Sequence, residues 1–268
     1  MARTITGMSA PADLMDDVLA SDLVDDTSRS AAREPVRAEV TARRRRRWGE
    51  QATLAAVSLG MLGSFLAITR TIGGEDGNPF DRAVVRKVGR VRHPVSNAVM
   101  SGVTFFGSAP GATVVSAIAI ARARRRPRLV PQLVLGALGG TIAELILKRF
   151  FRRQRPRLLD HLEDVTSTSF PSGHSMASSS LYVTLAFVAS RSRRLRRRRS
   201  SLLAGAGTWA ALIGATRVYL GVHWPTDVLG GLALGTAWAC AVEAVFDITG
   251  AERIEREAEA ASAPQLPA

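Results

Sequence analysis

The stretch VLGGLALGTAWACAVEAVF, residues 228–246, decides the fold class, because its 19 residues include only one charged side chain, Glu243. A helix needs about 20 mostly apolar residues to cross the roughly 30 Å hydrocarbon layer of a bilayer. Similar stretches, each with at most one charge, precede it at residues 52–69, 95–121, 129–147, 175–190 and 201–216. The sequence therefore predicts an all-α fold, a polytopic membrane bundle with six transmembrane helices.

The stretch 95–121 is the longest of the six, and Gly107, Pro110 and Gly111 interrupt it. Glycine and proline break or kink helices, so we expect an interfacial helix up to about Phe106 and a span that starts near Pro110. A single kinked helix is the alternative interpretation.

The chain carries a formal net charge of +13 at pH 7, which is also typical of nucleic-acid-binding proteins. However, 19 arginines lie in three segments, 33–47, 122–128 and 191–199, that alternate with the predicted spans. With six spans, all three segments fall on one side, which the positive-inside rule assigns to the cytoplasm. The charge pattern therefore predicts a multi-pass protein of the cell membrane, with both termini cytoplasmic and with no nucleic-acid partner.

Composition divides the chain into three parts. Residues 1–48 are predicted to be a disordered or partly helical cytoplasmic arm, residues 49–248 the six-helix transmembrane domain, and residues 249–268 a cytoplasmic tail. Cys240, the single cysteine, lies in the last span, where we interpret it as a small apolar group.

Three polar segments lie at the ends of these spans, on the predicted extracytoplasmic side: KRFFRRQRP (148–156), PSGH (171–174) and RVYLGVHWPTD (217–227). In the first segment Lys148 and Arg155 suit a phosphate, because a point charge and a planar guanidinium can bind several of its oxygens. The other cations in and just after this segment are interpreted as anchors at the membrane interface: Arg149, Arg152, Arg153 and Arg157.

The second segment precedes a predicted helix, for which Ser172 is a good N-cap. The free N–H groups of a helix start bind anions, and Gly173 allows a ligand to approach the backbone closely. His174 can protonate a leaving oxygen, because imidazole titrates near neutral pH. A simple helix cap beside an interfacial histidine is the alternative interpretation of this segment.

The third segment places Arg217 at the end of one span and Asp227 in the first turn of the next, within reach of His223. A carboxylate on one ring nitrogen fixes the imidazole tautomer and leaves the other nitrogen free as a nucleophile. Together the three segments predict a site for a phosphate ester. The residues alone do not decide which of His174 and His223 is the nucleophile.

These segments resemble the K-x6-R-P, P-S-G-H and S-R-x5-H-x3-D motifs of the type 2 phosphatidic acid phosphatase (PAP2) superfamily, over about residues 50–247. One departure is Thr216, where the family usually has serine. The family includes lipid phosphate phosphatases and bacterial undecaprenyl-diphosphate phosphatases.

The resemblance implies a role for each matching residue. His223 attacks phosphorus and becomes a phosphohistidine, Asp227 orients it, and His174 protonates the leaving group. The phosphoryl oxygens are held by Lys148, Arg155, Ser172, Gly173 and Arg217. The resemblance also implies that no metal or other cofactor is needed.

The sequence therefore predicts an integral-membrane lipid phosphatase with a lipid phosphate as substrate, and undecaprenyl or another polyprenyl diphosphate is the first choice. Phosphatidic acid, phosphatidylglycerol phosphate and a polyprenyl-phosphoryl sugar phosphate are alternatives. A transporter with a functional acid at Glu144 is a different class, although Glu144 is also placed for an ion pair with Lys148. A non-catalytic lipid-binding protein is the remaining alternative.

Overall fold

The computed structural model describes residues 41–42, 44–73 and 76–262, and this part of the chain contains helices and no strand. Contacts group the chain into residues 1–52 and 53–268, and every predicted site residue belongs to the second group. The first long helix is Arg44–Thr69. The later elements are α2 (Pro79–Gly89), α3 (Pro94–Thr104), the 3₁₀ turn η1 (Phe105–Gly107), α4 (Ala109–Ala123), η2 (Pro127–Leu129), α5 (Val130–Phe151), α6 (Gly173–Ser190), η3 (Arg196–Arg198), α7 (Arg199–Tyr219) and α8 (Pro225–Ser262).

The predicted division into arm, transmembrane domain and tail is only partly covered by these residues. Most of the predicted arm lies outside them, and residues 44–48 are helical. The predicted boundary at residue 248 falls inside α8. The three-part division stays a prediction.

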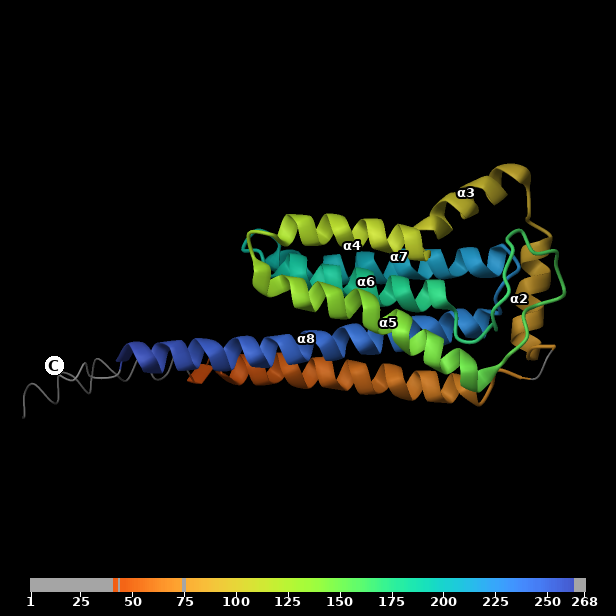
Figure 1. The fold of residues 1–268 in the computed structure, drawn as a ribbon. Coiled ribbons are helices and arrows are strands. Elements are labelled where there is room, and N and C mark those ends of the chain that lie inside the picture. The colour runs from red at the N-terminus through yellow and green to blue at the C-terminus, as the bar shows by residue number, and fades with distance from the viewer. Residues whose placement is uncertain (1–40, 43, 74–75, 263–268) are drawn as a thin grey trace, which may run out of the picture. The chain divides into compact units, whose positions relative to one another are not determined.

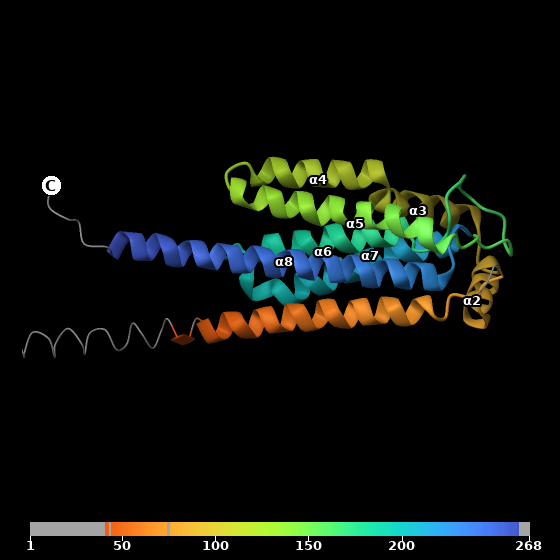
Figure 2. The same cartoon turned by 60° about the horizontal axis from the view of Figure 1, so that its bottom comes forward.

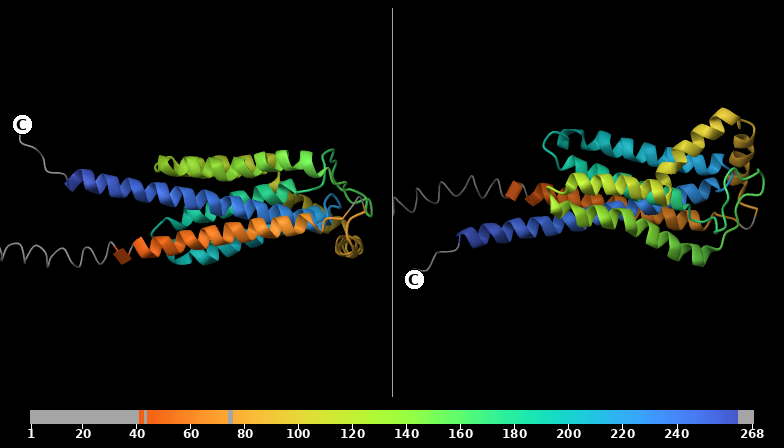
Figure 3. Two further views of the ribbon diagram at one scale, coloured as in Figure 1. Left: turned by 90° about the horizontal axis from the view of Figure 1, so that it is seen from below. Right: turned by 45° about the horizontal axis from the view of Figure 1, so that its top comes forward.

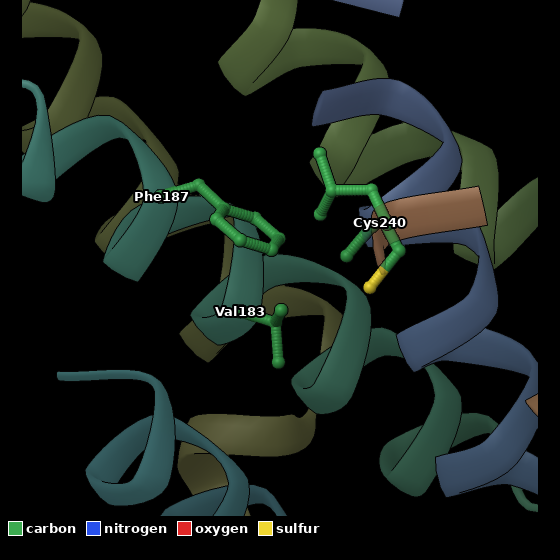
Figure 4. Packing of buried hydrophobic residues seen from close by; sticks show 5 residues of the cluster. Val183, Phe187 and Cys240 are labelled. Atoms are coloured by element: carbon green, nitrogen blue, oxygen red, sulfur yellow. The ribbon is translucent and has the colours of Figure 1, made fainter. Parts of the chain in front are cut away.

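Helix α6 is the centre of the bundle, where it packs against α5, α7 and α8 (Figures 1 and 2). Small residues permit this close approach, as is usual between membrane helices. Gly140 faces Ser180, and a Cβ at Gly140 would lie 3.0 Å from the serine Cβ. Away from the site, the packing is apolar: Val183 and Phe187 of α6 lie beside buried Cys240 of α8 (Figure 4).

Three of the described helices are long and apolar enough to cross a membrane: Arg44–Thr69, Pro127–Phe151 and Pro225–Thr249. The bent pair Pro94–Gly107 and Ala109–Ala123 adds a fourth if it forms one span. Helices α6 and α7 are not among these candidate spans, and α6 buries a run of serines inside the bundle. Three to four candidate spans are therefore established, and the count of six stays a prediction.

The break in the stretch 95–121 lies where the sequence predicts it. Helix α3 gives way to η1, the hydroxyl of Ser108 accepts a hydrogen bond from the N–H of Gly111 (3.3 Å), and α4 starts at Ala109. The two helices meet at a bend of 54°. A side chain at Gly111 would overlap the backbone of Phe105, so this glycine allows the sharp turn. The stretch is therefore two helices and not one gently kinked helix.

The chain order brings four helix ends together at one end of the bundle. Helices α5 and α7 end there, α6 and α8 begin there, and α2 and the connection 152–172 lie beside them (Figures 1 and 3). The three motif segments occupy these ends. The fold thus gathers residues that are up to 79 positions apart, from Lys148 to Asp227.

Candidate active site

His223 and Asp227 flank the start of α8 and face each other. The ring Nδ1 of His223 lies 3.4 Å from Oδ2 of Asp227. The same carboxylate oxygen accepts hydrogen bonds from the N–H of Trp224 (2.8 Å) and from the hydroxyl of Ser169. His223 and Asp227 are both buried, so the carboxylate is held firmly against one edge of the imidazole.

The other edge of the His223 ring faces Arg155, whose NH1 lies 3.2 Å from Nε2. The connection 152–172 and the turn before His223 hold this guanidinium, since it donates to the carbonyls of Ser167 (2.8 Å) and Val222 (2.6 Å). Burial, with a contribution from the charge of Arg217, lowers the pKa of Arg155 to about 10. Arg155 therefore remains a cation at neutral pH, directly beside the nitrogen that is free to react.

Burial also lowers the pKa of His223 to about 4, although Asp227 opposes the shift. A lowered pKa means that the folded protein keeps this imidazole neutral as the pH falls, until the pH approaches about 4. We expect NMR of ¹³C-labelled histidine to give a titration midpoint between about 4 and 5 that is lost in His223→Gln. A midpoint near 6.5, the ordinary value for histidine, would contradict this geometry.

Lys148 and Arg217, two of the predicted phosphate ligands, are paired with carboxylates. Lys148 lies 2.6 Å from Glu144, which is the i,i+4 pair anticipated from the sequence, and 3.2 Å from the hydroxyl of Ser167. Arg217 donates to Glu163 (2.7 Å) and to Thr104 (2.8 Å). Its buried Nε has no hydrogen-bond partner among the described residues, and so retains one free donor.

The start of α6 contributes Ser172, Gly173 and His174. Ser172 occupies the N-cap position as predicted, but its side chain caps no N–H of α6 within the described chain. Its hydroxyl instead accepts from Ser175 (3.0 Å), and its backbone N–H donates to the carbonyl of Asp227 (3.0 Å). A Cβ at Gly173 would overlap Oε1 of Glu144, so a larger residue here would displace this carboxylate.

His174 follows on the first turn of α6, within electrostatic range of the other site cations. The cations in range are Lys148, Arg155 and Arg217, and the neutral ring of His223 is also near. The departure at Thr216 has little consequence, because its hydroxyl donates to the carbonyl of Ile213 (2.6 Å), a bond that serine would also make. The fold therefore brings all eight predicted residues to one end of the bundle.

The interpretation of Arg153 as an interfacial anchor is wrong. Its side chain is 2% exposed and forms ion pairs with Asp227 (2.5 Å) and Asp81 (2.6 Å). Arg149, Arg152 and Arg157 are exposed. The motifs predicted no role for Arg153, Asp81 or Ser169. Arg153 occupies an unspecified position of K-x6-R-P, and the other two residues lie outside the three motif segments. The one signal in the sequence was Asp81, an acid in the first turn of α2, and an acid at this position usually reflects the helix dipole.

A cavity of about 370 Å³ borders Trp224 and is lined by none of the eight predicted residues. It is lined by Asp76, Arg82, Arg86, Gln154, Arg157, Leu158 and Trp224. The chemistry of the site therefore lies in the side-chain cluster around His223 and not in this cavity.

The comparisons with known proteins agree with the three motifs. Residues 129–248 match the family described as the PAP2 superfamily. Phosphatidylglycerophosphatase B of Bacillus subtilis (strain 168) is 32% identical over 176 residues, which cover 64% of this chain and 85% of the relative. Undecaprenyl-diphosphatase of Sulfolobus acidocaldarius is 25% identical over 192 residues, or 68% of this chain and 85% of the relative.

A solved structure gives the same answer for the fold. The crystal structure of the first transmembrane PAP2 type phosphatidylglycerolphosphate phosphatase from Bacillus subtilis superposes with a TM-score of 0.65 at 29% identity. The superposition covers 72% of this chain and 96% of that one. The chain therefore belongs to the PAP2 superfamily of membrane lipid phosphatases.

Proposed function

We propose that this protein hydrolyses the terminal phosphate of a membrane lipid through a phosphohistidine at His223. The observation that carries the proposal is the environment of the His223 ring, with the Asp227 carboxylate on Nδ1 and the Arg155 guanidinium beside Nε2. A neutral imidazole held in this way is a nucleophile aimed at an anion-binding site.

In the proposed reaction Nε2 of His223 attacks phosphorus while the bond to the leaving-group oxygen breaks. His174 donates its proton to that oxygen, and Asp227 stabilises the positive charge that develops on the His223 ring. Lys148, Arg155, Arg217, Ser172 and the N–H of Gly173 hold the phosphoryl oxygens. A water molecule then attacks phosphorus and loses its proton to His174, which releases inorganic phosphate and restores His223.

A polyprenyl diphosphate is the first candidate substrate, in keeping with the relative named undecaprenyl-diphosphatase. The second candidate is phosphatidylglycerol phosphate, which the relative named phosphatidylglycerophosphatase B favours. Phosphate release by the purified protein from both lipids and from phosphatidic acid separates them, with His223→Ala as the blank. A clear preference in kcat/KM for phosphatidylglycerol phosphate would reassign the substrate, and no release from any lipid would refute the proposed function.

We expect turnover to continue in EDTA. Fixed cations and N–H groups can neutralise the phosphoryl charge that a metal ion carries in other phosphatases. The measurement is phosphate release before and after chelation, followed by addition of Mg²⁺, Mn²⁺ or Zn²⁺. Loss of activity in EDTA that a divalent ion restores would show that the enzyme depends on a metal.

The active site is proposed to face away from the cytoplasm, with six spans and both termini inside. The arginine-rich segments 122–128 and 191–199 lie at the opposite end of the bundle from the start of α8 (Figure 1). In a Cys240→Ser background, an impermeant thiol reagent should label Thr166→Cys in intact cells and Ser200→Cys only after lysis. Both positions are exposed in the folded chain. The reverse labelling pattern would invert the topology.

A further inference from the structure

Arg153 connects two buried carboxylates at the back of the site. Its NH1 donates to Asp227 (2.5 Å) and to the hydroxyl of Thr226 (2.8 Å). Its NH2 donates to Asp81 (2.6 Å) and to the carbonyl of Ile72. Asp81 and Asp227 are completely buried, so one guanidinium balances two carboxylates that have no water to screen them.

Asp81 reaches the start of α8 from α2. One of its oxygens accepts from the N–H of Thr226 (2.9 Å) and the other from the Thr226 hydroxyl (2.7 Å). Thr226 directly precedes Asp227, so these bonds fix the backbone that carries the carboxylate. Asp81, in the first turn of α2, therefore stabilises the start of α8 as well as its own helix.

Arg153 also acts on Asp227 through its main chain. Its carbonyl accepts from the N–H of Ser169 (2.8 Å), and the hydroxyl of Ser169 donates to Asp227. The Trp224 ring lies 5.5 Å below the guanidinium and limits its movement. Two independent connections therefore lead from this one residue to the carboxylate that contacts His223.

We propose that Arg153 and Asp81 are positioning residues for the nucleophile, and that Arg153 divides its charge between Asp81 and Asp227 and so sets how strongly Asp227 supports a positive charge on His223. The inference rests on the proposed function, because it assigns this control to the phosphohistidine step. Neither residue contacts the substrate in the proposed reaction.

The charge balance explains how such control works. Asp81, Arg153 and Asp227 together carry one net negative charge, which a positively charged His223 ring would neutralise. The other ionisable groups around the site are contributed by α5, the connection 152–172, α6 and α7: Glu144, Lys148, Arg155, Glu163, His174 and Arg217. These groups stay the same when Arg153 or Asp81 is changed, so they contribute equally to the two variants.

The two neutral substitutions should move the His223 titration in opposite directions. Arg153→Gln leaves two uncompensated carboxylates, which favour a protonated ring, so the midpoint should rise by about 1 pH unit or more. In Asp81→Asn, Asp227 is the one carboxylate left to pair with Arg153, so the His223 midpoint should fall. If Arg153 and Asp81 only stabilised the fold, their substitution would not shift the His223 midpoint in opposite directions.

Turnover should follow the same logic. Arg153→Gln should lower kcat about 100-fold, because Asp227 loses the hydrogen bond that positions it, and the loss should deepen at pH 5 and below, where more of the nucleophile is protonated. KM should change less than about threefold, since the phosphate ligands are intact. The double variant Asp81→Asn/Arg153→Gln removes one uncompensated carboxylate and should recover about tenfold of the lost activity. Arg149→Gln, an exposed arginine on the same segment, is the matched control and should resemble the wild type.

The experiment is the ¹³C-histidine titration of the full chain in detergent, combined with pH-dependent kinetics for the four variants. Opposite midpoint shifts with rescue in the double variant support the proposal. Shifts below about 0.3 pH unit, shifts in the same direction, or no rescue overturn it. If Arg153→Gln does not fold, Asp81→Asn alone decides the test, through a lower His223 midpoint and a changed kcat at an unchanged KM. The titration requires no turnover, so inactivity of the wild type would refute the proposed function without removing this test.

Discussion

We expect His223→Ala to abolish turnover and the covalent phosphoenzyme together. No other group in the site has a ring nitrogen between a carboxylate and an arginine, among the residues that the structure describes. Loss of a nucleophile costs on the order of 10⁴-fold or more in kcat. The measurement is acid quenching with ³²P-labelled substrate, followed by peptide mapping of the labelled protein.

His174→Ala is the matched variant for this experiment, because it removes the second imidazole of the same site. With an activated aryl phosphate the leaving group needs little protonation, so this variant should still form labelled phosphoenzyme. With a lipid substrate its turnover should be low. Label on His174, or label that persists in His223→Ala, would exchange the two roles.

Asp227→Asn should lower kcat on the order of 10⁴-fold, as removal of an orienting carboxylate does in other histidine-dependent enzymes. The asparagine keeps the shape of the side chain but loses the charge that stabilises a positive His223 ring. It also loses the ion pair with Arg153, although Arg153 keeps its second partner, Asp81. We therefore expect a lower thermal midpoint together with the loss of activity.

The two effects of Asp227→Asn can be separated. Asp227→Asn leaves Arg153 paired with Asp81, so the variant should stay folded while its turnover is lost. Size-exclusion profiles and circular dichroism show whether each variant is folded. Near wild-type activity of folded Asp227→Asn would mean that this residue only caps α8.

The sequence predicted the helical bundle and the chemistry of its site because both depend on local patterns. An apolar run of 19 residues with one charge has few folded states other than a buried or membrane-spanning helix. His223 and Asp227 lie four residues apart at a helix start, so their contact needs no distant partner. The break near Gly107 was equally local, because glycine and proline act on their own turn.

The tertiary structure alone decided which arginine of KRFFRRQRP is buried. Arg149, Arg152, Arg153 and Arg157 have the same chemistry, and the sequence treats them alike. Arg152 adopts a left-handed conformation with φ of 43°, which ends α5 and marks where the chain turns before Arg153. Asp81, 72 residues earlier, then meets Arg153 through the packing of α2. Such a pairing depends on how distant helices pack, and no local pattern in the sequence encodes it.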